Sequence, residues 1–152
     1  MAAALLQLFR YRYQDMRCLF LIFCITPGVS AAAPACIPAF DEFLSKFEAN
    51  RSFQEENIIL PLKHSFVDAG AEPEPKVIDI PLSKSEVVER LAPVFPSQAD
   101  QKKLQLEKLI MSPRLDGRIV QLQKPDTGHL LIYHFQKIGE CWKLVEFEDT
   151  SI

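Results

Sequence analysis

The sequence predicts an α+β fold in which a curved antiparallel sheet packs against helices, and three features of the 152-residue chain carry that prediction. An amphipathic helix is expected over residues 38–50, and a capped helix over residues 84–91. Strands joined by short turns are expected over residues 118–148. A meander of this kind buries one of its faces by packing on helices.

The first helix is indicated by the spacing of its apolar side chains. Phe40, Phe43, Leu44 and Phe47 fall at positions i, i+3, i+4 and i+7, so they lie on one stripe of a helix. Such a stripe hides a large apolar area only by packing against another layer. We expect it to pack on the sheet, with Phe53 continuing the apolar surface in a short turn.

Two strands are expected next, over residues 58–60 and 62–67, with Pro61 between them. A proline inside such a run favours an edge strand or a bulge, because it donates no hydrogen bond to a neighbouring strand. Residues 68–75 form a loop rich in proline and acidic residues, and residues 76–80 form a short strand.

The middle helix begins at a capping box, in which Ser83 and Glu86 satisfy free amides at the helix start. The following segment, residues 97–112, mixes two patterns. Ser97 suits a helix cap, while Leu104 and Leu106 alternate as in a strand, so we expect a helix with a strand tail.

The final third contains the meander, with strands over residues 118–123, 129–138 and 142–148. The first strand follows the dipeptide Asp116-Gly117, which is typical of a hairpin turn. The strand over residues 129–138 is apolar at both alternating sets of positions, which predicts a central strand covered on both faces.

Residues 17–35 have the pattern of a secretory signal peptide. Arg17 precedes a short apolar run, then a Pro-Gly pair and small residues. The apolar run is shorter than the roughly 20 residues that cross a bilayer. We expect cleavage after Ala31, so that residues 1–31 are a leader and residues 32–152 form a single domain.

Two further expectations concern this leader. Met16-Arg17 already makes a complete start for a signal peptide, so translation is expected to begin at Met16. The exported domain is expected to be periplasmic or secreted. The alternative is a lipid-anchored form modified at Cys36.

The composition excludes some classes of binding partner and indicates the oxidation state of the cysteines. Residues 1–31 contain three arginines and one aspartate, so their removal changes the net charge from −3 to −5. An acidic balance without basic clusters argues against nucleic-acid partners and anionic membrane surfaces. Of four cysteines, Cys36 and Cys141 remain, and one disulfide between them is expected in an exported domain, with two separate buried thiols as the alternative.

The order of these elements, together with residues 40–44, 127–135 and 141–144, resembles the nuclear transport factor 2-like (NTF2-like) superfamily of cone-shaped, cystatin-like α+β proteins. More narrowly, it resembles an uncharacterised family of exported bacterial domains with that fold. The resemblance implies the fold and no activity, because such folds host both enzymes and binding modules. The aspartate, tyrosine and histidine arrangement of the isomerase and dehydratase members has no match in this chain.

The candidate ligand-pocket residues are Tyr133, His134, Phe135 and Trp142. If the sheet curls around a cavity, one set of these side chains lines it, since small-ligand sites are mostly apolar with a few polar groups. The alternative is that Tyr133 and Trp142 pack on the helices with their polar ends at the rim. The chain has no His-x-His or Cys-x-x-Cys motif, so neither a metal site nor a cofactor is expected.

The sequence therefore favours an exported, non-catalytic binding or accessory domain for a small apolar ligand or a cell-envelope partner. The alternative is a small enzyme that uses general acid–base chemistry inside the cone, with His134 or Tyr133 and an unnamed carboxylate. Dimerisation through the open face of the sheet is compatible with the first hypothesis.

Overall fold

The structure is a computed structural model, and it describes residues 36–152. The expected leader over residues 1–31 and the start at Met16 lie outside the described residues. Ten elements follow one another in the chain: α1 (Phe40–Ala49), α2 (Arg51–Glu56), β1 (Ile58–Asp68), β2 (Lys76–Leu82), α3 (Lys84–Leu91), α4 (Gln98–Leu104), β3 (Glu107–Arg114), β4 (Gly117–Gln123), β5 (Leu130–Ile138) and β6 (Cys141–Asp149).

The six strands form one curved sheet in the order β2-β1-β6-β5-β4-β3. Neighbouring strands are antiparallel except β1 and β6, which run parallel. The expected all-antiparallel sheet is therefore a mixed one. The difference arises because the last strand inserts beside the first, a long-range pairing that no local pattern encodes.

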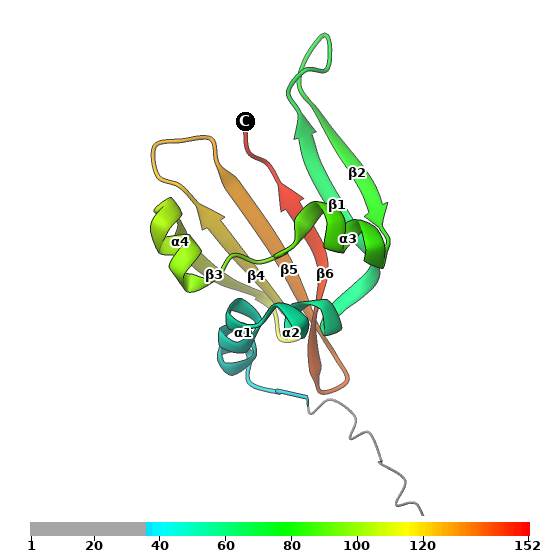
Figure 1. Cartoon of the computed structure of the whole chain (residues 1–152), viewed down its shortest axis with the longest axis vertical. Coiled ribbons are helices and arrows are strands. Elements are labelled where there is room, and N and C mark those ends of the chain that lie inside the picture. Colours follow the sequence, from blue (N-terminus) through cyan, green and yellow to red (C-terminus); the bar gives the residue numbers. More distant parts are fainter. Residues whose placement is uncertain (1–35) are drawn as a thin grey trace, which may run out of the picture. The chain divides into compact units, whose positions relative to one another are not determined.

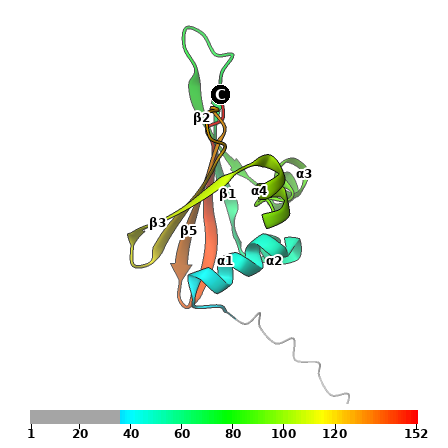
Figure 2. The same cartoon turned by 90° about the vertical axis from the view of Figure 1, so that its left-hand side faces the viewer.

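The four helices lie on one face of this sheet (Figure 2). The core fills the space between them, and the predicted stripe of α1 forms one side of it, since Phe43, Leu44 and Phe47 are almost completely buried. The hairpin of β1 and β2 extends beyond the rest of the sheet, with its turn at the top of Figure 1.

Two helices follow their sequence signals closely. The middle helix α3 spans Lys84–Leu91 as predicted, and the Ser83 backbone N–H donates to Glu86 Oε2 at 2.9 Å. Phe53, expected in a short turn, lies instead in the separate helix α2. Asn50 makes this possible because its extended backbone ends one helix, and its side chain accepts the Phe53 N–H of the next at 3.0 Å.

Pro61 does not interrupt its strand, because β1 runs continuously from Ile58 to Asp68. The bulge expected at this proline is present as a register shift against β6 between Ile58 and Lys63. β1 is not an edge strand, since β2 and β6 lie on either side of it. A bulge removes the need for the N–H that proline lacks.

The segment of mixed pattern resolves into a short helix and a full strand. α4 ends at Leu104, where Gln105 adopts a left-handed conformation (φ 59°), and β3 then runs for eight residues. The meander therefore has four strands, β3 to β6, in place of the three expected. Its first turn is made by Leu115 and Asp116, and Gly117 is already the first residue of β4, opposite Arg114.

The strand β5 is central, as expected, but it is not covered on both faces. Tyr133 and Phe135 are buried beneath the helices, whereas Ile132, His134 and Gln136 on the opposite face remain partly or fully exposed. The two sets alternate along the strand, so they point to opposite faces. We call the helix-covered side the inner face and the other side the open face.

Candidate functional site

The inner face holds three of the four candidate pocket residues, and each contacts other aromatic rings. Tyr133 is 1% exposed, and its ring centroid lies 4.4 Å from that of Phe95 and 4.9 Å from that of Phe147. Burial raises the pKa of the Tyr133 hydroxyl well above its usual range. A hydroxyl in this environment stays protonated and is a poor base.

The other two inner-face candidates pack against α1. The Phe135 ring lies between 5.3 and 5.8 Å from the rings of Phe40, Phe43 and Phe47. The Trp142 ring packs edge-on against Phe40, and its Nε1–H donates to the Pro38 carbonyl at 3.0 Å. The volume that a ligand would need at these residues is occupied by side chains of the protein itself.

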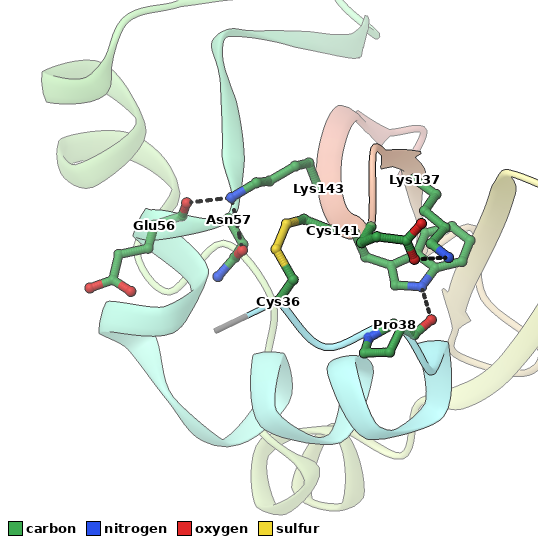
Figure 3. Close-up of a disulfide and its surroundings, with 9 residues drawn as sticks. Cys36, Pro38, Glu56, Asn57, Lys137, Cys141 and Lys143 are labelled. Atoms are coloured by element: carbon green, nitrogen blue, oxygen red, sulfur yellow. Dashed lines mark hydrogen bonds and ion pairs between the residues drawn. A yellow bond between two sulfur atoms is a disulfide. The ribbon is translucent and has the colours of Figure 1, made fainter. Parts of the chain in front are cut away.

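The disulfide expected between Cys36 and Cys141 is present, with the two Cα atoms 4.9 Å apart (Figure 3). It joins the segment before α1 to the start of β6. Close by, the Lys143 ammonium donates to the Glu56 carbonyl and to Asn57 Oδ1, at 3.1 and 3.0 Å (Figure 3). These contacts hold α1, α2 and the last hairpin together.

His64 on β1 is an inner-face residue that the sequence did not single out. It pairs across the sheet with Phe147, and its ring lies 5.5 Å from Phe66 and 5.1 Å from Phe147. Its Nδ1 atom is buried and has no hydrogen-bond partner among the described residues. Only the even spacing of Leu62, His64 and Phe66 along one strand could have indicated that this histidine faces the core.

Desolvation lowers the pKa of His64 below 6.5, an effect that nearby Arg90 reinforces and Asp149 opposes. Asp149 lies on β6 and Arg90 on α3, so the histidine meets one charge of each sign. Asp149 also acts on Tyr133, and the rings of His64 and Tyr133 both pack against Phe147, so the three residues lie in one region of the inner face. Among the described contacts, no hydrogen bond joins His64 to either of the other two.

The open face holds the fourth candidate, His134, and pairs it with a carboxylate. His134 Nε2 bonds to Glu148 Oε1 across β5 and β6. Two further polar pairs lie on the same face, Lys63 with Glu146 at 2.6 Å and Ser65 with Asp79 at 2.6 Å. The polar side chains of these three pairs thus have hydrogen-bond partners within the sheet.

A hollow of about 340 Å³ opens on this face beside His134 and the β3–β4 turn. Its lining includes Arg114, Asp116, Gln136 and Glu146, so it presents charges of both signs. Such a lining suits a polar group more than an apolar molecule. The sequence correctly predicted that His134 and Tyr133 lie on opposite faces of the sheet. It could not identify Glu148 as the partner of His134, or the hollow, because both depend on strand pairing.

Within residues 36–152, no three histidine, cysteine or acidic side chains lie close enough together to hold a metal ion. The third histidine, His129, lies beside Ser151, with Nδ1 2.9 Å from Oγ. No helix in this described part of the chain is long and apolar enough to cross a membrane.

No family model matches the chain, and no curated protein matches it. Several solved structures match it. An NTF2-like protein from Bacteroides fragilis matches with a TM-score of 0.55 and 23% identity, over 74% of this chain and 47% of that one. The chain thus spans about half the length of that protein.

Two other solved structures match at lower scores. An NTF2-like protein from Cytophaga hutchinsonii has a TM-score of 0.40 and 12% identity, over 74% of this chain and 92% of that one. A protein of unknown function with a cystatin-like fold, from Nostoc punctiforme, has a TM-score of 0.40 and 10% identity, over 74% and 88%. The Bacteroides fragilis likeness carries one conclusion, which concerns the fold: the domain has an NTF2-like fold.

Proposed function

We propose that this NTF2-like domain is an exported, non-catalytic binding or accessory domain, and that a protein of the cell envelope docks on the open face of its sheet. The observation that carries the proposal is the contrast between the two faces. The inner face is filled by aromatic side chains, whereas no described helix covers the open face (Figure 2).

The filled inner face favours a protein partner over a small apolar ligand. A ligand placed beside Tyr133 or Trp142 would have to displace rings that pack at centroid distances of 4.4 to 4.9 Å. Cores are packed close to crystal density, so displacement on this scale costs packing energy without an equivalent gain.

The open face suits a protein surface because it combines apolar side chains with polar side chains that already have partners within the sheet. Ile119, Ile132 and Val145 are half-buried there. Lys63 forms an ion pair with Glu146, and His134 is hydrogen-bonded to Glu148, before any partner arrives. Covering a matched pair removes less solvation than covering an isolated charge.

The disulfide supports export, because disulfides form and persist in oxidising compartments. It also favours the soluble form over the lipid-anchored one. A Cys36 sulfur bonded to Cys141 has no free valence for a lipid thioether, so the two modifications exclude each other on one molecule.

The test is native mass spectrometry of the protein purified from its own envelope, for the wild type and two variants. Ile132→Arg places a charge on the open face, and Val88→Arg makes the same change on α3 as a control. We expect a protein partner bound to the wild type and to Val88→Arg and lost from Ile132→Arg. A bound small molecule that survives in Ile132→Arg would overturn the proposal, and so would a dimer that this variant dissociates.

A second candidate function rests on the pair formed by His134 and Glu148. A histidine oriented by a carboxylate can act as a general base, and the carboxylate that the enzyme hypothesis lacked would be Glu148. Its place on the open face differs from the expected place inside the cone. Turnover of p-nitrophenyl esters that is abolished in His134→Gln but retained in His129→Gln would favour this enzyme; equal turnover in both variants would remove it.

A further inference from the structure

We propose that β3 pairs antiparallel with β3 of a second copy of this chain, joining the two sheets edge to edge. This surface is the rim of the sheet and is distinct from the open face of the proposed function. β3 pairs only with β4 among the described strands, so its outer rim has no strand partner there. An uncapped rim of backbone N–H and C=O groups is a ready template for another strand.

Several of the exposed apolar residues of the described chain lie at this edge. Ten large apolar side chains are exposed, and four of them, Leu104, Leu109, Ile110 and Leu115, lie between the end of α4 and the β3–β4 turn. Ile110 faces α1 beside a hollow of about 190 Å³, while Leu109 lies on the open face. An edge strand that is apolar on both sides resembles a central strand that lacks a neighbour.

The charges at the two ends of β3 indicate that the strand that pairs with it is β3 of a second copy. Glu107 begins the strand and Arg114 ends it. Both lie on the open-face side. Their partners on β4 are Gln123 and Gly117, which alternate along the strand with the buried inner-face residues Val120 and Leu122. In an antiparallel pair the start of one strand meets the end of the other, so this strand is complementary to itself.

The register shift in β3 makes the match closer. One extra residue lies between Met111 and Arg114 relative to β4. Once this bulge is allowed for, a two-fold axis at Ile110 places Glu107 opposite the partner's Arg114, twice by symmetry. The same register sets Leu109 opposite the partner's Met111. Opposite charges and apolar pairs directly across a ladder are the stabilising arrangements.

Two features shape the contact about the axis at Ile110. Pro113 lacks an N–H and lies in the irregular stretch, so the regular ladder covers residues 109–111 of each copy, and Glu107 meets the partner's Arg114 beyond it. Lys108 points to the inner face, where Glu48 holds its ammonium at 2.6 Å, and it therefore brings no free charge to the axis. The joined sheets would align their open faces into one wider surface.

The test is sedimentation velocity of the full exported protein over a concentration series, with a charge-swap cycle. Glu107→Arg gives like charges across the rim, and so does Arg114→Glu, so each variant should associate at least about tenfold more weakly than the wild type. The double variant Glu107→Arg/Arg114→Glu should recover association. An equimolar mixture of the two single variants should also associate, because each then meets its complement.

The matched control is Val77→Lys on β2, the opposite edge strand, where a 61% exposed side chain gains a charge. It should associate like the wild type. A wild type that remains monomeric at millimolar concentration would overturn the proposal, as would a double variant that fails to recover. Dimers insensitive to the swaps but dissociated by Ile132→Arg would place self-association on the open face, which also overturns this edge contact.

Discussion

His64 places an ionisable ring among aromatic side chains, with one buried nitrogen left without a hydrogen bond in the described structure. The arrangement is tolerated because a neutral imidazole costs far less to bury than an imidazolium. Protonation would add a charge beside Phe147 and near Arg90, and only Asp149 would offset it. Protonation of His64 at acidic pH is therefore expected to destabilise the fold.

The first prediction concerns this histidine and pH. Its pKa is lowered from 6.5 by desolvation, so the unfolded state binds the proton more readily than the native state. Stability from this group is present above pH 6.5 and is lost as the pH falls below it. We expect the urea-unfolding free energy of the wild type to drop more steeply from pH 7.5 to 5.5 than that of His64→Phe.

The control for this measurement is His134→Gln, which changes a half-exposed histidine on the open face. It should retain the wild-type loss of stability in acid. Equal pH slopes for the wild type and His64→Phe would show that the buried ring does not control the acid response.

At the scale of elements, short polar signals decide where helices end. Asn50 stops α1 and caps α2, and Gln105 stops α4 by adopting a left-handed conformation. Gln54 then ties α2 to the segment before α4, since its side chain donates to the Phe95 carbonyl at 2.9 Å and accepts the Phe95 N–H at 3.1 Å. These contacts set the direction in which the chain enters each strand.

The second prediction concerns the junction between α1 and α2. Asn50→Ala removes the side-chain oxygen that accepts the Phe53 N–H, and loss of such a cap costs about 1 kcal/mol of unfolding free energy. Asn50→Asp should retain most of the stability that the cap provides, because its carboxylate can accept the same hydrogen bond. Ser52→Ala, an exposed change in the same helix, should stay within about 0.5 kcal/mol of the wild type. Chemical denaturation measures all three, and equal losses for Asn50→Ala and Ser52→Ala would contradict the capping role.

At the scale of the whole molecule, the disulfide closes almost the entire domain. Cys36 and Cys141 are 105 residues apart in sequence, so the bond links the segment before α1 to the final hairpin. The parallel pairing of β1 with β6 makes a similar long-range connection. Both contacts bring the ends of the domain together, so they constrain the unfolded chain strongly.

The third prediction follows from that loop. Closing about 100 residues removes unfolded-chain entropy worth about 4–5 kcal/mol in the chain-entropy model. We expect the double variant Cys36→Ser/Cys141→Ser to lose stability of that order and to melt at a lower temperature. The wild type should shift similarly after reduction, whereas the double variant should not respond to reductant. A loss below about 1 kcal/mol would mean that other contacts already hold the two ends together.

Local patterns in the sequence determined the helix stripe of Phe40 to Phe47, the capped helix α3, the alternation of Tyr133 against His134, and the disulfide partners. Each depends on neighbours a few residues apart or, for the cysteines, on the expectation that Cys18 and Cys24 leave with the leader. Only the tertiary structure decided the mixed sheet, the filled inner face, the pairing of His134 with Glu148, and the open edge at β3. These features depend on which distant strands lie side by side, and strand pairing is a long-range choice that hydrophobic periodicity alone does not specify.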